Sequence, residues 1–496
     1  RFLITVVICK FSTMIKTPDW VKNAVFYQIF PDRFARSGST IKGQWQASQY
    51  EGWDATPTYQ GYKGGNLWGV IKKLDYIKDL GVNAIYFTPI FQSASNHRYH
   101  THDYYQVDPV LGGNVAFAAL IKAAHEHEIK IVLDGVFNHA SRGFFFFNDI
   151  LENGPNSPWL DWFKIYGWPL SAYDGSKPAN YEGWIGDRAL PEFNHDNPQV
   201  KEYIMQVAEY WLHQGIDGWR LDVPNEVDTP GFWQEFRDRV KAVNPEAYIV
   251  GEIWGDASYW LDGTQFDGVM NYRFAEAAIA FAAGDNYLPE FCHGELRPYP
   301  PISGTEYAMR IDALLKLYDW EIQLAQLNLL DSHDTPRLLT AVGEDKSSFM
   351  LATVLMMTFP GAPSIFYGDE VGLLGGKDPD CRRAFPEPAN WDVEILKDYK
   401  QLIALRHQYS ALSTGTYKTL YAGQHLYVFA RILDREEAVV AVNVGTEQAD
   451  AVFNVTELQS QPEQVVYGSG RIDWHNTNEG KKLELVLPAQ SSIIVV

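Results

Sequence analysis

Short apolar runs recur along most of the chain, and polar or charged residues stand directly after several of them. Runs of about four to eight residues rich in Val, Ile and Leu are typical of strands that are buried on both faces. Helix-length stretches separate the runs, which predicts parallel strands joined by crossover helices. The expected strands cover residues 25–30, 82–87, 129–133, 215–220, 247–251, 266–270, 326–330 and 364–367.

These eight strand–helix units predict an α/β protein built on a (β/α)8 TIM barrel. After the third strand the next long helix begins only near Pro198, and the intervening stretch is rich in Gly, Pro, Trp and Asn. A loop of that length is uncommon in a compact domain, so we expect a small inserted domain after strand 3. From about Tyr417 short alternating runs predict a C-terminal antiparallel β-sandwich.

The predicted boundaries follow from these changes of pattern. Met14 has the character of a natural start, so we expect the residues before it to be an extension. The expected parts are the extension at 1–13, the barrel at 14–138 and 194–413, the inserted domain at 139–193 and the sandwich at 414–496. The apolar residues 2–9 also fit a secretion signal, although no small-residue cleavage site follows them.

Charge and composition narrow the expected partners. The net charge of −21 over 496 residues repels nucleic-acid phosphates and anionic lipid, so a neutral ligand fits better than nucleic acid or a membrane surface. Aromatic residues make up 14% of the chain, which suits either stacking on sugar faces or a large core. The cysteines, Cys9, Cys292 and Cys381, have no disulfide or zinc spacing and favour a reducing, cytoplasmic location. No run is long enough to cross a bilayer.

Four polar cassettes close predicted strands. They are DGVFNH at 134–139, GWRLD at 218–222, GEIW at 251–254 and DSHD at 331–334. Because the carboxyl ends of parallel barrel strands meet on one face, we expect the cassettes to converge there. Strands buried on both sides have little reason to end in charge, so the convergence indicates a catalytic site. Its expected members are Asp222, Glu252, Asp334, Arg220, His139 and His333.

The three acids suit the cleavage of a glycosidic bond, which requires two carboxyl groups around the transition state. Arg220 and Asp222 lie two residues apart on one strand, so they share a face, and we expect the guanidinium to hold Asp222 ionised as a nucleophile. Glu252 stands in a less polar setting, which raises its pKa and suits a general acid. Asp334 could hold sugar hydroxyls. The alternative for any one of these acids is a buried ion pair.

At these residues the chain resembles the α-amylase family, glycoside hydrolase family 13, and the resemblance extends from Trp20 onward. It implies that Asp222 is the nucleophile, Glu252 the acid/base and Asp334 the transition-state stabiliser. Further roles implied by the resemblance are orientation of Asp222 by Arg220, sugar binding by His139 and His333, and stacking under the sugar by Tyr99 with His97 nearby. His100, His102 and His125 are expected at the surface or in packing.

Within the family the chain is similar to neopullulanases, cyclomaltodextrinases and maltogenic amylases. The resemblance rests on residues 251–257, 267–272 and 375–383. It implies that Trp254 stacks beyond the scissile bond, and that Asp378 and Arg382 clamp a sugar on the non-reducing side. The subgroup's N-terminal β-domain is not expected here, which points toward longer or branched substrates, as in debranching enzymes, and leaves the oligomeric state open.

The sequence therefore predicts a retaining α-glucan hydrolase that acts on α-1,4 or α-1,6 bonds of malto-oligosaccharides, pullulan or branched maltodextrins through a glucosyl-Asp222 intermediate. Transglycosylation or isomerisation at the same site is an alternative, and a non-catalytic amylase-like binding protein is a distant one. The loop after Arg33 lacks the Asn/Asp cluster that binds calcium in some relatives, so we expect no metal or other cofactor. The expected partner is an α-glucan.

Overall fold

A computed structural model describes residues 14–37, 49–478 and 480–496. The predicted extension at 1–13 and Cys9 lie outside the described residues. Eight parallel strands form the central sheet, and each lies on one of the predicted apolar runs. They are β1 (Phe26–Ile29), β2 (Ala84–Phe87), β5 (Lys130–Gly135), β6 (Gly218–Leu221), β7 (Tyr248–Gly251), β8 (Gly268–Val269), β9 (Leu327–Asn328) and β10 (Ala362–Phe366).

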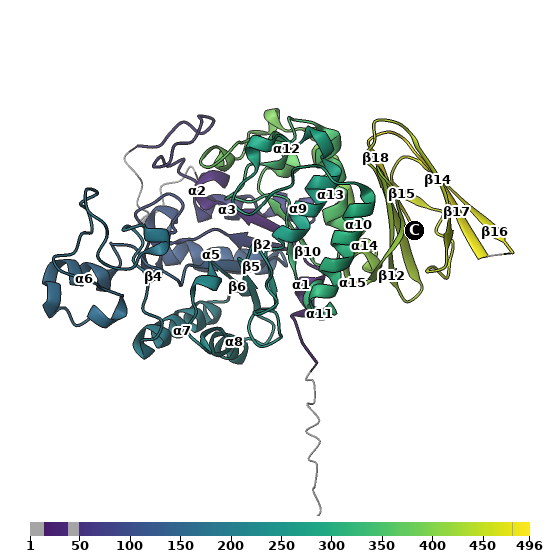
Figure 1. The fold of residues 1–496 in the computed structure, drawn as a ribbon. Helices are drawn as coiled ribbons and strands as arrows, with labels where there is room; N and C mark the ends of the chain where they lie inside the picture. Colours follow the sequence, from purple (N-terminus) through teal and green to yellow (C-terminus); the bar gives the residue numbers. More distant parts are fainter. Residues whose placement is uncertain (1–13, 38–48, 479) are drawn as a thin grey trace, which may run out of the picture.

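The sheet closes into a barrel, which confirms the predicted fold class. Its strand order is β8-β7-β6-β5-β2-β1-β10-β9, and a parallel bridge between Met270 and Leu327 joins the two ends. Helices surround the strands (Figure 1). The longer ones are α5 (Gly113–Glu126), α7 (Pro198–His213), α8 (Phe232–Val243), α9 (Tyr272–Ala282), α10 (Gly304–Leu317), α13 (Lys346–Thr358) and α14 (Val393–Gln408). Strands β1, β2 and β7 are buried along their whole length, which fits their largely apolar sequences.

Local sequence explains where the first helical segment begins and ends. Asn66 caps α3 (Leu67–Lys72) by accepting a hydrogen bond from the Gly69 N–H. A short break at Lys73 separates it from α4 (Leu74–Leu80), which ends at Gly81 with φ of 96°. That left-handed conformation is available to glycine at little steric cost, so the helix stops there.

A hairpin that the apolar pattern does not predict follows β2. It consists of β3 (Phe91–Ser93) and β4 (Thr101–Val107), and its loop carries His97 and Tyr99. Polar residues are frequent in this stretch, and the pairing of the two short strands is irregular, so period-two alternation is lost. The hairpin matters because it delivers its loop to the catalytic face.

Residues 139–193 fold between β5 and α7 around an aromatic core. The segment contains α6 (Phe145–Asn153) and short 3-10 turns, and it is held by isolated antiparallel bridges such as His139 to Glu192 and Phe163 to Phe193. The rings of Phe147 and Phe163 lie 5.0 Å apart in an edge-to-face arrangement. Such pairs add to the burial of apolar area, and they give this strand-poor segment a core.

Two antiparallel sheets form the C-terminal part, as predicted. One has the order β11-β12-β13-β18-β15 and the other β14-β17-β16. Leu426, Val428, Leu483 and Leu485 are buried between them. The five-stranded sheet adjoins the barrel through α10, α13 and α14, and the three-stranded sheet lies on its far side (Figure 1). The strands are β11 (Thr416–Ala422), β12 (Leu426–Leu433), β13 (Glu436–Asn443), β14 (Ala449–Val455), β15 (Val465–Gly468), β16 (Arg471–Thr477), β17 (Gly480–Leu487) and β18 (Ser491–Val495).

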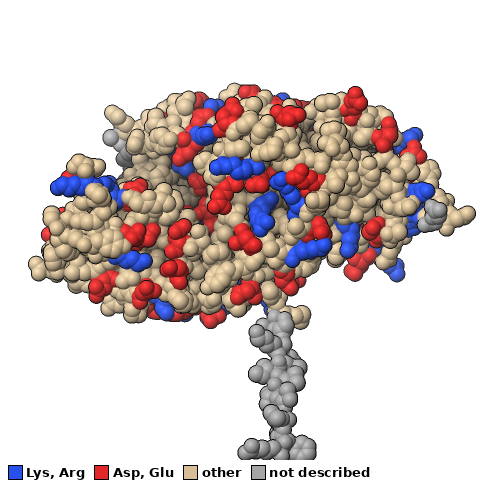
Figure 2. All heavy atoms as spheres, in the orientation of Figure 1, with Lys and Arg blue, Asp and Glu red and all other residues tan. Residues whose placement is uncertain are grey.

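Charged side chains are interspersed over the face drawn in Figure 2, with acidic and basic groups next to one another on both the barrel and the sandwich. With a net charge of −21, this face offers polyanions no broad basic surface. Among the described residues, none forms a helix with both the length and the apolar character that crossing a bilayer requires.

Candidate active site

A cavity of about 670 Å³ opens at the carboxyl ends of the barrel strands. Asp222 follows β6, Glu252 follows β7 and Asp334 lies a few residues after β9, so three separate strands deliver the three acids. Nine of the residues singled out from the sequence line this catalytic cavity: Asp222, Glu252, Asp334, Tyr99, His97, His139, Trp254, Asp378 and Arg382. Arg220 and His333 lie beneath it, each with a fully buried side chain.

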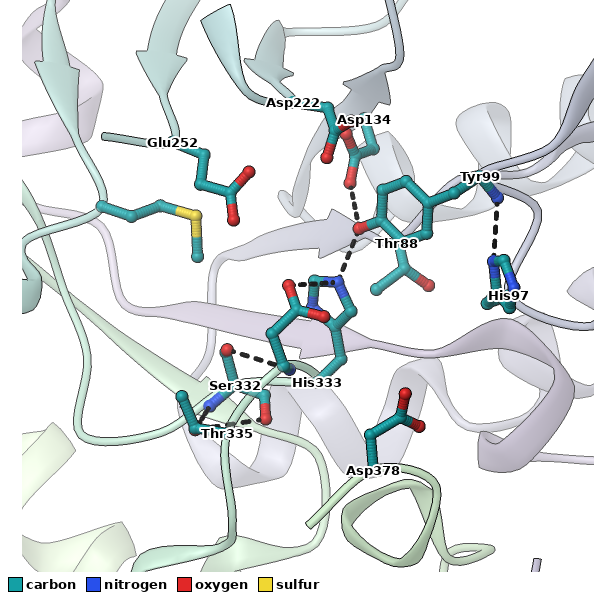
Figure 3. A network of polar contacts seen from close by, with 12 residues as sticks. Thr88, His97, Tyr99, Asp134, Asp222, Glu252, Ser332, His333, Thr335 and Asp378 are labelled. Carbon is teal, nitrogen blue, oxygen red and sulfur yellow. Dashed lines mark hydrogen bonds and ion pairs between the residues drawn. The ribbon is translucent and has the colours of Figure 1, made fainter. Parts of the chain in front are cut away.

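Arg220 connects the acids. Its Nη1 donates hydrogen bonds to Asp222 Oδ1 and Asp134 Oδ1, each at 2.9 Å, and its Nη2 lies 3.0 Å from Glu252 Oε2 in an ion pair. Asp222 and Glu252 therefore contact different nitrogens of one guanidinium. Figure 3 shows their carboxyl groups facing a common space. The predicted contact between Arg220 and Asp222 is present, but three carboxyl groups share that cation.

Because three carboxyl groups share Arg220, the pKa values expected for Asp222 and Glu252 change. Burial raises the pKa of Asp222 well above its ordinary value, Arg220 opposes the rise, and Glu252 and Asp134 add to it. Burial also raises the pKa of Glu252, again against Arg220. The prediction that Arg220 simply holds Asp222 ionised is therefore incomplete, because one guanidinium faces three carboxyl groups and the pKa values of both Asp222 and Glu252 are raised.

A second polar chain runs across the floor of the cavity. Gln28 Nε2 lies 2.7 Å from His333 Nδ1, and His333 Nε2 lies 2.6 Å from the Tyr99 hydroxyl and 3.0 Å from Asp334 Oδ2. The Tyr99 hydroxyl donates to Asp134 Oδ2 at 2.9 Å. The Tyr99 ring also stacks on the His333 ring, with centroids 5.4 Å apart and planes 8° apart. These contacts fix the face that Tyr99 presents to the cavity.

Arg382 organises the neighbouring wall. Its Nε donates to the His333 carbonyl oxygen, its Nη2 donates to Asp334 Oδ1 at 3.2 Å, and its Nη1 pairs with Asp378 Oδ1 at 3.0 Å. Burial acts to raise the pKa of Asp334, but His333 and Arg382 outweigh it and lower that pKa below its usual range. Asp334 is therefore ionised at neutral pH, ready to accept hydrogen bonds from sugar hydroxyls. Asp378 and Arg382 lie together, as the resemblance implies.

Histidine rings in the wall are held neutral. Burial lowers the pKa of His139 to about 3 and lowers the pKa of His97 well below its usual value. His97 Nδ1 accepts a hydrogen bond from the Tyr99 N–H at 3.2 Å. A neutral imidazole can both donate and accept, which suits sugar hydroxyls. His100 also lines the cavity, contrary to its prediction as a surface or packing residue.

Trp254 stands beside the second acid. Its indole N–H donates to Glu252 Oε1 at 3.2 Å, and one face stacks on Tyr272 with ring centroids 3.7 Å apart and planes 4° apart. A second indole, Trp184, stacks on His139 at 5.5 Å and also lines the cavity. Both rings reach the cavity from loops, where they are held by partners from other elements.

Sequence reasoning missed several wall residues: Thr58, Tyr59, Gln60, Trp184, Asp187 and His293. All lie in connecting segments outside the four cassettes, so they cannot be found by looking for polar residues at the ends of apolar strands. The clue available for Trp184 is its place in the long aromatic insertion after β5. Asp134 and Gln28 were likewise assigned no role, although Asp134 opens the first cassette and binds Arg220.

An eight-stranded barrel that gathers three carboxylic acids, a shared arginine and aromatic rings around one cavity defines a glycoside hydrolase. Comparison with known proteins narrows this class. Residues 28–390 match the family described as alpha amylase, catalytic domain, and residues 415–495 match the alpha-amylase C-terminal domain.

Two enzymes from bacteria illustrate the similarity in sequence. Neopullulanase 2 of Thermoactinomyces vulgaris is 43% identical over 458 residues, which cover 90% of this chain and 73% of that protein. A cyclomaltodextrinase of Geobacillus thermopakistaniensis is 42% identical over 441 residues, covering 88% and 71%. In structure, a debranching enzyme from Nostoc punctiforme is similar with a TM-score of 0.92 and 64% identity over 97% of this chain and 100% of that one. The chain belongs to the α-amylase family of glycoside hydrolases.

Proposed function

We propose that this protein hydrolyses α-1,4 and α-1,6 glucosidic bonds of malto-oligosaccharides, pullulan or branched maltodextrins, with retention of anomeric configuration. The observation that carries the proposal is the placement of Asp222 and Glu252 on one guanidinium, facing the cavity that Asp334 also lines. Relatives named neopullulanase, cyclomaltodextrinase and debranching enzyme support the substrate class.

In the productive form Glu252 is protonated and Asp222 is ionised. Asp222 accepts a charge-assisted hydrogen bond from Arg220, which favours its ionised form more strongly than neutral donors do. The hydrogen-bond donors to Glu252, the Trp254 indole and the Val223 N–H, are neutral, and its contact with Arg220 is an ion pair. The carboxylate thus lies where a nucleophile is required and the acid where a leaving oxygen needs a proton.

The reaction then runs in two displacements. The Asp222 carboxylate attacks the anomeric carbon while the glycosidic bond breaks, and the Glu252 proton passes to the leaving oxygen. Water next attacks the same carbon and gives a proton back to Glu252, and the bond to Asp222 breaks. Asp334 accepts hydroxyl hydrogen bonds as the ring distorts. Tyr99, His97, His139 and His333 hold that sugar, while Asp378 and Arg382 hold the sugar on its non-reducing side.

Two further proposals concern the cofactor requirement and the cellular location of the protein. The reaction uses no metal or organic cofactor, because acids and a guanidinium from the chain supply the nucleophile, the proton and the charge stabilisation. The cytoplasm is the proposed location, supported by the scarcity of cysteine and by the unpaired Cys292 and Cys381.

Asp222→Asn tests the mechanism. It should lower kcat by at least about a thousandfold while the fold is retained, and activity within about tenfold of the wild type would remove Asp222 from the mechanism. Digestion of maltotriose, pullulan, β-cyclodextrin and branched maltodextrin, with the products sized, identifies the bonds that are cleaved. Products longer than the substrate would indicate transfer to a sugar, and NMR of the first product should show the retained anomer.

A further inference from the structure

A second cavity, which the proposed reaction does not use, lies where the barrel meets the C-terminal sandwich. Its volume of about 650 Å³ is close to that of the catalytic cavity. The barrel contributes the end of α9 with the following turn and the segment before α10, and the sandwich contributes the loops around β12, β13 and β18. Figure 1 shows α10 and α13 between the barrel strands and the sandwich. We call this space the junction cavity.

The junction cavity has an apolar floor and a polar rim. Phe281, Ala283 and Ile302 are buried at the floor. The rim is exposed and carries amide, carboxyl, hydroxyl and imidazole groups: Asp285, Asn286, Gln424, His425, Thr446, Glu447 and Gln448. Sugars present rings of hydroxyl groups, and the polar side chains of the rim match these groups.

The charges at the rim exclude other common ligands. Of the described residues that line the junction cavity, none is Lys or Arg, while Asp285 and Glu447 are acidic. A phosphate or carboxylate ligand would meet repulsion there, and a purely apolar ligand would leave the polar rim without partners. A neutral, hydroxyl-rich molecule satisfies the rim without either cost.

Several rim groups have unused hydrogen-bonding capacity on rigid supports. Within the described part of the chain, the side chains of Gln424, His425, Glu447 and Gln490 make no hydrogen bond or ion pair. Their backbone is fixed nonetheless. The Gln424 carbonyl oxygen accepts from the Gly304 N–H at 3.0 Å, and the Gln490 N–H donates to the Gly445 carbonyl oxygen at 2.9 Å. Rigid supports with free polar groups lower the entropic cost of binding.

The backbone of Gln490 is strained. It occupies the turn between β17 and β18 with φ of 44°, in the left-handed region where glycine is favoured. A strained residue that lines a cavity motivates a functional hypothesis for that cavity. Glycine would relieve the strain but remove the amide that reaches the junction cavity.

The two cavities are close along the chain. Asn286 lines the junction cavity and His293 lines the catalytic cavity, seven residues later. Fully extended chain spans at most about 3.6 Å per residue, so their Cα atoms lie within about 25 Å. One branched glucan can therefore reach both sites, and simultaneous contact raises the local concentration of the second chain.

We propose that the junction cavity is a second, non-catalytic binding site for an α-glucan chain. This inference rests on the proposed function for the identity of the sugar. It assigns Gln424, His425, Glu447 and Gln490 to hydroxyl recognition, and it gives the sandwich a part in holding branched substrate while cleavage proceeds in the barrel.

A titration without turnover tests the proposal. Maltoheptaose is titrated calorimetrically into the full chain carrying Asp222→Asn, and two sites per chain are expected. Adding Gln424→Ala and Gln490→Gly should weaken one site by at least about tenfold, the effect of one or two lost hydrogen bonds, and leave the other unchanged. Gln408→Ala, an exposed glutamine outside both cavities, serves as the matched control. A single site that the double change does not affect would overturn the proposal.

Activity measurements on a short and a branched substrate distinguish binding at the junction cavity from the proposed catalytic function. With Asp222 intact, Gln424→Ala plus Gln490→Gly should leave kcat/KM for maltotriose within about twofold and raise KM for amylopectin by at least about threefold. Thermal unfolding should occur at a higher temperature in the Gln490→Gly single variant, which shows that loss of binding is not loss of fold. A KM for amylopectin that is the same in the double variant and in the wild type would contradict glucan binding at the junction cavity. A wild type that cleaves no α-glucan would refute the proposed function alone.

Discussion

Asp134 offers the most direct test of the electrostatics beneath the catalytic acids. Its carboxylate and that of Asp222 accept hydrogen bonds from the same Arg220 nitrogen, each at 2.9 Å. Two oxygens bound to one nitrogen lie at most about 5.8 Å apart, which is twice 2.9 Å. At an effective dielectric constant of about 20, two unit charges at that separation repel by about 3 kcal/mol.

Asp134→Asn removes this repulsion and leaves Arg220 to Asp222 and Glu252. The pKa of Asp222 should fall, and because Asp222 reacts in its ionised form, the acidic limb of kcat/KM should move to lower pH. A repulsion of about 3 kcal/mol corresponds to about two pKa units, and reorientation of Arg220 absorbs part of it. We therefore expect the limb to move down by at least about one pH unit, measured with a chromogenic malto-oligosaccharide between about pH 3 and pH 8.

Asp267→Asn is the matched control for this change. Asp267 is fully buried like Asp134, but it precedes β8 and pairs with Arg237 and Lys241, at the opposite end of the barrel strands. Its substitution should leave the acidic limb in place even if it lowers stability. An acidic limb that stays fixed or moves upward in Asp134→Asn, or that moves equally in both variants, would refute the reasoning.

Three further outcomes follow from other parts of the structure. The buried Lys63 ammonium donates to the carbonyl oxygens of Gly52 and Ala55, so the loop formed by residues 49–63 already contains a cation. Dialysis against EDTA should therefore leave kcat within about twofold of that of the untreated enzyme. Lys63→Met removes both hydrogen bonds and should lower the unfolding temperature. Ile185 has φ of 46° and is 81% exposed, and Ile185→Gly should raise the free energy of unfolding by up to about 1 kcal/mol in denaturant titration. The fully buried Arg431 donates to four carbonyl oxygens and has no acidic partner among the described residues, so Arg431→Met should cost at least about 3 kcal/mol, measured in the same way.

The barrel and the positions of its acids could be predicted because one physical constraint shapes both. Strands buried on two faces are predominantly apolar, so a charged residue directly after such a run marks the point where the strand leaves the core. Asp222 and Glu252 stand at such points, and closure of the barrel brings them to one face. The cavity wall has no such constraint. Tyr59 reaches it because Asn96 donates to its carbonyl oxygen across 37 residues of sequence, and neither residue's local pattern indicates that contact.

The protonation of Asp222 shows a further limit on reasoning from neighbouring residues. The spacing of Arg220 and Asp222 correctly places the guanidinium beside the carboxylate, and an isolated pair of this kind would lower the pKa of the acid. Burial of Asp222 reverses this effect, and Asp134 and Glu252, which are 88 and 30 residues away from Asp222 in sequence, bind the same guanidinium and add to the rise. A raised pKa is what a general acid requires, so the burial of Glu252 has a functional consequence. Local sequence specifies the pair of groups, whereas the fold specifies how many acids compete for one positive charge.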